Sequence, residues 1–123
     1  FNNELLNDIN NLGSDVFSRY IYGKNISKTQ LCKIYSWNEF QVIERSFNYA
    51  IRTNIDKIEL IGCQFFLNYE TYFNTYISDI DYDMYSSPHK VLVNGKYYLL
   101  DRLKVKYNVG VSLRYKNIFD PKL

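Results

Sequence analysis

The chain has 123 residues, of which 46% are hydrophobic and 23% charged, which is typical of one globular domain and argues against a disordered segment. Its apolar runs, such as the one around residues 65–67, are far too short to cross a bilayer, which argues against a membrane protein. The net charge of +2 is unevenly spread: residues 56–83 carry six acidic and one basic side chain, and residues 84–123 carry eight basic and two acidic ones. This asymmetry bears on partners rather than on the fold.

The first predicted element is a helix between Asn3 and Gly23. Asn3 can cap its start and Gly23 its end. Apolar residues recur between them at steps of three and four, as one face of a helix requires. They are Leu5, Ile9, Leu12, Val16 and Tyr20. A break at Gly13, giving two short helices, is the alternative.

Residues 27–47 predict two further helices. Ser27 with Gln30 forms a capping-box pattern that opens a short helix. Asn38 is placed to cap a second helix that runs to Ile51.

This segment resembles the helix-turn-helix motif of DNA-binding regulators. The resemblance is carried by Leu31, Cys32, Ile34, Ser36, Trp37, Asn38 and Val42. In that family the second helix enters the major groove of DNA. The resemblance therefore implies base contacts by Asn38, Glu39, Gln41 and Arg45. The structural alternative is a packed helix pair that binds no DNA, with Trp37 in the core.

Residues 56–77 repeat the helical spacing and predict another helix, although Gly62 and the dense run at 65–67 leave a strand over 56–67 as an alternative. Residues 79–88 predict a loop. Its alternating carboxylates resemble the start of a calcium loop, but Met84 stands where glycine is required, so no metal is expected. The same loop is the alternative partner-binding surface, through Asp79, Asp81, Tyr82 and Asp83.

The last third predicts antiparallel hairpins. Asn94-Gly95 between the apolar arms of residues 91–99 is a strong hairpin signal. Residues 103–115 alternate with period two and are expected to fold back at Asn108–Gly110. One face of this sheet would then be basic and could bind the phosphates of a nucleic acid. It comprises Arg102, Lys104, Lys106, Arg114 and Lys116.

These elements predict a single α+β domain over residues 1–123, helical over 1–78 and antiparallel β over 89–117, in an order similar to winged helix-turn-helix proteins. The predicted function is a small non-enzymatic regulator from a phage or mobile element that binds double-stranded DNA. By analogy with the helix-turn-helix family, it would be a homodimer. It would act in the cytoplasm without metal or cofactor, with Cys32 and Cys63 reduced in the core.

Two other functions remain open. One is a protein-binding inhibitor of a host nucleic-acid enzyme, acting through the acidic loop. The other is a metal-free ribonuclease that uses Tyr, Lys and Arg side chains, whereas a Ser-His-Asp or Cys-His arrangement would depend on His89, the only histidine.

Overall fold

The computed structural model describes residues 2–26, 28, 31–54, 57–65, 76–101 and 103–110, with the side chains of the first helix described from Leu12 onward. The elements follow in chain order. They are α1 (Asn2–Ile26), β1 (Lys33–Trp37), α2 (Val42–Asn54), β2 (Glu59–Cys63), α3 (Asp79–Asp83), β3 (Lys90–Val93), the 3-10 helix η2 (Lys96–Tyr98) and β4 (Lys106–Val109).

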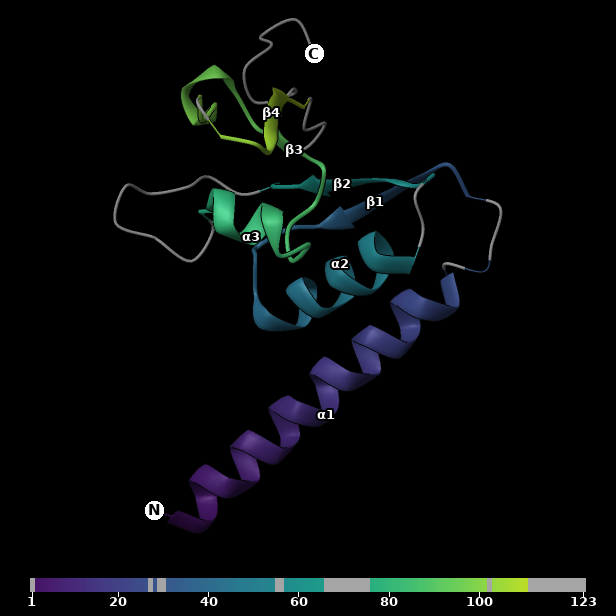
Figure 1. Ribbon diagram of the computed structural model, residues 1–123. Coiled ribbons are helices and arrows are strands. Elements are labelled where there is room, and N and C mark those ends of the chain that lie inside the picture. Colours follow the sequence, from purple (N-terminus) through teal and green to yellow (C-terminus); the bar gives the residue numbers. More distant parts are fainter. Residues whose placement is uncertain are drawn as a thin grey trace, which may run out of the picture.

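The four strands form one parallel sheet in the order β1-β2-β3-β4. The register places Ile34 beside Leu60, Gly62 beside Val91, and Val91 beside Tyr107. Parallel neighbours need a crossover between them, and α2 supplies the one from β1 to β2. Helices α2 and α3 lie on the same side of the sheet, and α1 forms a further layer below α2 (Figure 1).

Two buried clusters hold α2 and α3 on the sheet. The first contains Ile51, Ile58 and Leu60, with Ile34 and Phe47 packed against it. The second joins the later strands to the loops, and consists of Phe40, Ile77, Val91, Val93 and Val105. Each fully buried aliphatic side chain stabilises the fold by roughly 1.5–3 kcal/mol.

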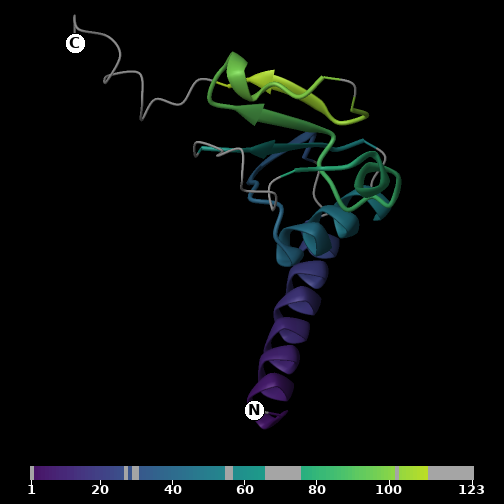
Figure 2. The same cartoon turned by 90° about the vertical axis from the view of Figure 1, so that its left-hand side faces the viewer.

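Helix α1 packs on α2 through its second half. The hydroxyl of Ser46 donates to the carbonyl of Val16 at 2.6 Å, and Tyr20 lies 6.3 Å from Tyr49 between ring centroids. Gly23 allows the closest approach, because a Cβ there would come within 2.8 Å of the Cβ of Ala50. The first half of α1 extends away from the body (Figure 2).

The predicted fold class is therefore corrected from α+β with antiparallel hairpins to α/β with a parallel sheet. The long N-terminal helix is confirmed, but it continues through both Gly13 and Gly23. The predicted helix-turn-helix is wrong at its first helix, because Lys33–Trp37 is a strand paired with β2. The second helix begins at Val42 rather than after Asn38.

The Asn94-Gly95 hairpin is also wrong. Gly95 has φ 170° and ψ 168°, which is extended backbone and not the left-handed conformation that a tight hairpin needs. A 3-10 helix follows, and β4 then pairs with β3 in parallel. The expected turn at Asn108–Gly110 is absent, because Asn108 and Val109 lie within β4 and the Gly110 N–H continues the pairing to the Val93 carbonyl at 2.8 Å.

Between β1 and β3, two further expectations change. Residues 59–63 form a strand, so the strand alternative at the start of the 56–77 segment is correct, while residues 66–75 lie outside the described residues. The stretch expected to be a loop contains the short helix α3, whose Ser78 and Asp81 form a capping box. Arg102, Arg114 and Lys116 also lie outside the described part of the chain.

Candidate functional site

A pocket of about 410 Å³ lies between the second half of α1, strand β1 and the start of α2. It sits toward the carboxyl end of β1 and the amino end of α2, the end of a parallel α/β sheet at which ligands commonly bind. Its walls are mainly apolar and aromatic. The residues that line it are Arg19, Tyr22, Ile26, Ile34, Tyr35, Ser36, Trp37, Ile43, Glu44, Phe47 and Asn48. We call this space the α1–β1 pocket.

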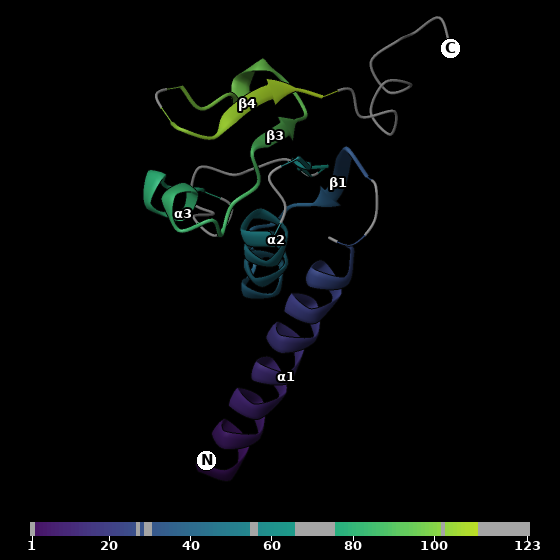
Figure 3. The same ribbon diagram turned by 45° about the vertical axis from the view of Figure 1, so that its right-hand side comes forward.

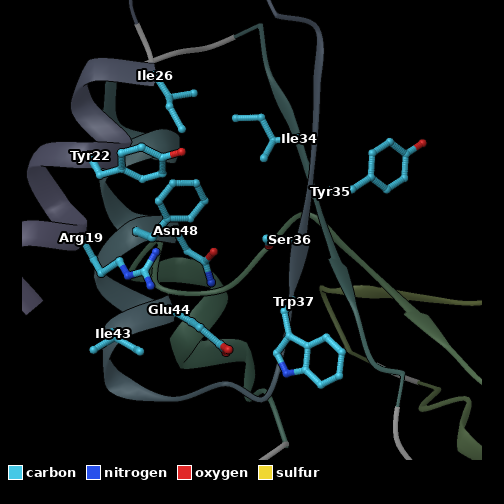
Figure 4. Close-up of a pocket in the computed structure, with 11 residues that line it drawn as sticks. Arg19, Tyr22, Ile26, Ile34, Tyr35, Ser36, Trp37, Ile43, Glu44 and Asn48 are labelled. Atoms are coloured by element: carbon cyan, nitrogen blue, oxygen red, sulfur yellow. The ribbon is translucent and has the colours of Figure 1, made fainter. Parts of the chain in front are cut away.

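The three elements place their side chains by simple periodicity. Arg19, Tyr22 and Ile26 follow one another at helical steps along α1, next to the stripe that packs on α2. On β1, Ile34 and Ser36 point toward the helices, whereas Tyr35 points to the other side of the strand (Figure 4). A pocket of this size, with apolar walls and few polar groups, is typical of small-molecule sites.

Arg19 supplies the positive charge of the pocket. Its guanidinium extends from α1 toward the space beside β1 (Figure 4). Among the residues described, no hydrogen bond or ion pair engages it. The guanidinium is therefore available to a ligand that carries a carboxylate or phosphate.

Glu44, near the start of α2, supplies a carboxyl group to the pocket lining. Burial raises its pKa, and the neighbouring backbone N–H groups oppose that rise. One of its oxygens accepts the Gln41 N–H at 3.2 Å, which makes Gln41 the N-cap of α2 and Glu44 its reciprocal partner. The Glu44 side chain is also part of the pocket lining.

Asn48 and Ser36 complete the polar lining. The Asn48 side chain is buried, and its amide N–H₂ donates to the Ser86 carbonyl at 3.0 Å. This bond fixes the amide and leaves its oxygen as an acceptor. The hydroxyl of Ser36 both donates and accepts. The pocket thus combines acceptors inside with the Arg19 donor at its wall.

The residues predicted to read DNA bases lie in the β1–α2 connection and the first turn of α2, and they are largely engaged within the protein. Asn38 is 1% exposed, and its side chain lies on Gly62. The Gln41 amide donates to Glu39 at 2.8 Å. Arg45 donates to the Phe40 carbonyl at 3.3 Å and stacks on the Phe40 ring at 4.0 Å.

Phe40 itself adopts φ 60° while it is almost fully buried. A non-glycine residue in the left-handed region costs about 1–2 kcal/mol, and burial of the ring beneath Arg45 offsets that cost. The connection is therefore a fixed loop rather than the turn of a helix pair. Trp37, expected in the core, is 51% exposed.

The predicted basic face and the predicted acidic loop meet each other. The ammonium of Lys104 lies 2.6 Å from a carboxylate oxygen of Asp83, and the Lys104 backbone N–H donates to Asp79 at 2.8 Å. Arg45 pairs with Asp81 at 3.4 Å. Lys106 is exposed on β4. The charges that looked like two separate surfaces therefore neutralise one another in part.

Tyr82, the fourth residue of the predicted partner surface, is held by Arg52. The guanidinium donates to the Tyr82 carbonyl at 3.0 Å and to the Ser87 carbonyl at 3.1 Å, and it lies 4.3 Å from the Tyr82 ring centroid. Burial lowers the pKa of Arg52. These contacts make Tyr82 part of the packing between α2 and α3.

His89 and the two cysteines lie outside the α1–β1 pocket. His89 accepts the Leu60 N–H on Nδ1 at 2.9 Å, which is a structural role. Cys63 is buried as expected, whereas Cys32 is exposed, and both thiols are free. Within the described ranges, no cluster of three or more His, Cys, Asp or Glu side chains could hold a metal ion.

Sequence reasoning missed most of the pocket. Arg19, Tyr22 and Ile26 carried a usable signal, since they form a second stripe at helical spacing beside the core stripe of α1. Asn48 and Phe47 carried no such sequence signal, because their place in the pocket depends on where α1 crosses α2.

Comparison of the chain with protein-family models, with curated proteins and with solved structures finds no match in any of the three. In the part of the chain that is described, no helix combines the length and the apolar character that crossing a bilayer requires. The geometry of the α1–β1 pocket is therefore the basis for assigning a function.

Proposed function

We propose that this domain binds a nucleoside phosphate in the α1–β1 pocket. The observation that carries the proposal is that an uncommitted Arg19 and a half-buried Glu44 line one pocket whose other walls are mainly apolar and aromatic. Arg19 would bind the phosphate, because a guanidinium matches phosphate oxygens in two parallel hydrogen bonds.

The base would occupy the apolar part of the pocket. Tyr22 and Phe47 offer aromatic surface, and every nucleobase has a face that stacks on such rings. The acceptors of Glu44 and Asn48 suit the amino and imino donors on a base edge. The volume of about 410 Å³ lies within the range of small-molecule sites.

The ligand could come from two sources, a free nucleotide or one unit of single-stranded nucleic acid, and both carry the same base and phosphate. A base inside a duplex is stacked and paired, so it cannot enter the pocket without being extruded. The proposal keeps the nucleic-acid chemistry expected from the sequence and moves it from a helix-turn-helix to the pocket.

Trp37 is the only tryptophan of the chain and lines the pocket, so its fluorescence reports on occupancy. The test is a titration of the purified chain with the four ribonucleoside monophosphates, with the matching nucleosides and with single-stranded oligonucleotides. We expect a saturable change in Trp37 emission with a phosphate-containing ligand. No change with any of these probes at about 1 mM, a weak but measurable affinity, would overturn the proposal.

Arg19→Gln provides the specific test. It should weaken nucleotide binding by about 10- to 100-fold, the worth of a charge-assisted hydrogen bond, and leave nucleoside binding unchanged. Lys24→Gln is the matched control, because it removes one positive charge from the same helix outside the pocket lining. Equal losses in the two variants would contradict a specific role for Arg19. Tighter binding of oligonucleotides identifies nucleic acid as the source, and equal or weaker binding identifies the free nucleotide.

Binding of double-stranded DNA through Lys104 and Lys106 stays a prediction, and the same titration tests it with a duplex. Reversing both charges (Lys104→Glu with Lys106→Glu) should abolish duplex binding if that surface is used. A duplex affinity that falls steeply with salt in the wild-type chain would support it.

A further inference from the structure

Strand β1 is an edge of the sheet with no partner strand on its outer side among the described residues. Figure 3 shows β1 at one margin of the sheet and β4 at the other. Edge strands are sites of pairing between chains unless charges, prolines, bulges or covering segments protect them. Over its five residues β1 has regular register with β2, no proline, and one charged side chain, Lys33.

The backbone groups that face outward can be identified from two hydrogen bonds. The Cys32 carbonyl accepts the Glu59 N–H, and the Asn38 N–H donates to the Cys63 carbonyl, both at 3.0 Å. Because backbone groups alternate in direction along a strand, those of Lys33 and Tyr35 point away from β2. They are ready to pair with another extended strand.

The side chains on the uncovered face of β1 favour association. Tyr35 is 62% exposed, and Trp37 contacts the ring of Phe65 at 5.4 Å between centroids. No described helix covers this side of the sheet (Figure 3). At the opposite edge, β4 carries the exposed polar residues Lys106 and Asn108. The aromatic edge is therefore at β1.

We infer that β1 pairs antiparallel with β1 of a second copy of this chain, about a two-fold axis at Tyr35. In this register Tyr35 lies opposite Tyr35 of the second copy, and Lys33 lies opposite Trp37. Cross-strand aromatic pairs and a cation over an indole ring are both favourable. An axis at Lys33 would instead place like charges opposite each other, and an axis at Trp37 would shorten the overlap. The strand is thus complementary to itself in one register.

The two sheets then continue into one of eight strands, and Lys33 of the second copy lies beside Trp37 at the rim of the α1–β1 pocket. The inference goes beyond nucleotide binding and does not depend on it. Its readout is the mass of the particle, whereas the readout of the proposed function is the emission of Trp37.

Sedimentation equilibrium over a range of protein concentrations tests the pairing. We expect the wild-type chain to dimerise. Tyr35→Lys should weaken the dimer by at least about tenfold, because it removes an aromatic pair and opposes like charges at the axis. Val109→Lys, at a half-exposed position on the β4 edge, is the matched control and should leave the dimer intact.

A charge-pairing experiment guards against a folding defect. Tyr35→Glu alone should also weaken the dimer. Mixing Tyr35→Lys chains with Tyr35→Glu chains should restore it, because residue 35 lies on the axis and is opposite residue 35 of the second copy. Circular dichroism of each variant checks that the fold is retained. A wild-type chain that stays monomeric at the highest attainable concentration would overturn the inference. So would a dimer that Tyr35→Lys leaves unchanged, or a mixture that associates no better than its components.

Discussion

His89 extends the pairing between β2 and β3 with its side chain. Its backbone N–H donates to the Leu60 carbonyl at 2.9 Å, and its Nδ1 accepts the Leu60 N–H at the same distance. The ring must be unprotonated at Nδ1 to accept this bond, so the proton of the neutral ring lies on Nε2. Burial and the nearby Arg52 charge lower the pKa of His89.

The lowered pKa of His89 predicts a loss of stability in mild acid. The unfolded chain takes up a proton near pH 6.5, whereas the folded chain resists until its own lower pKa is reached. The free energy of unfolding should therefore be constant above about pH 7 and fall below 6.5, by at most about 1.4 kcal/mol per pH unit for one proton. Urea denaturation between pH 5 and 8 measures this fall.

His89→Asn is the diagnostic variant. Its amide oxygen can accept the Leu60 N–H at every pH, so the pH dependence above about pH 5 should flatten. A slope that is the same in both proteins would assign the effect to another group. Titration of Glu44 cannot produce the same pH dependence. Its pKa is raised in the folded chain, so its contribution makes the free energy of unfolding fall as pH increases.

At the scale of elements, two glycines in α1 have opposite roles. Gly23 lies against Ala50, and its Cβ substitute would meet side-chain and backbone atoms at 2.8–3.3 Å. Gly13 has no atom within 4 Å of that position. Both lie within one helix, so the intrinsic gain of replacing glycine by alanine is similar at both sites.

Gly13→Ala should stabilise the protein by roughly 0.5–1 kcal/mol, because alanine favours the helix. Gly23→Ala should destabilise it by about 1–3 kcal/mol, because α1 must move away from α2. Thermal or urea denaturation of the two variants measures the difference. Stabilisation by both substitutions would show that α1 does not pack tightly on α2.

The elements that sequence reasoning placed correctly are those with strong local signals. The apolar stripe of α1 predicted a long helix, and residues 91–93 were expected to be extended. Strand β1 was missed because five residues are too few to separate period two from helical spacing when helix-capping residues flank them. Its strand character depends on β2, which comes later in the chain. The Asn94-Gly95 signal failed because β3 pairs with β4 across a longer connection rather than through a tight turn.

The site was harder to predict than the fold. Arg19, Ser36 and Glu44 come from three elements, and only the crossing of α1 over α2 brings them to one pocket. The charged clusters that the sequence made prominent are instead satisfied by each other, as Lys104 with Asp83 shows. A surface charge is visible in a sequence, but its partner is fixed by tertiary structure.

At the scale of the whole molecule, Arg52 connects the two halves of the chain. Its side chain extends from α2 to the backbone of Tyr82 within α3 and of Ser87 beyond it, and it lies 5.1 Å from the centroid of the Tyr85 ring. One planar guanidinium thus holds the later segment against the first βαβ unit.

Arg52→Lys should therefore cost about 1–3 kcal/mol, because an ammonium group loses the planar stacking of the guanidinium on the rings of Tyr82 and Tyr85. Arg19→Lys is the control, with the same chemical change at an exposed position, and should alter stability by less than about 0.5 kcal/mol. Chemical denaturation compares the two. Equal effects would mean that the Arg52 contacts contribute little to holding the halves together.

The strand order of the sheet has a consequence for how the chain is made. Among the described strands, β2, β3 and β4 each pair with the strand that precedes them along the chain, so none of these waits for a later strand to be inserted between two neighbours. As a ribosome releases the polypeptide from its amino end, β1, α2 and β2 can close around Ile51, Ile58 and Leu60 before β3 has been synthesised. The nascent domain can thus grow in one direction, with each new strand added at the edge opposite β1.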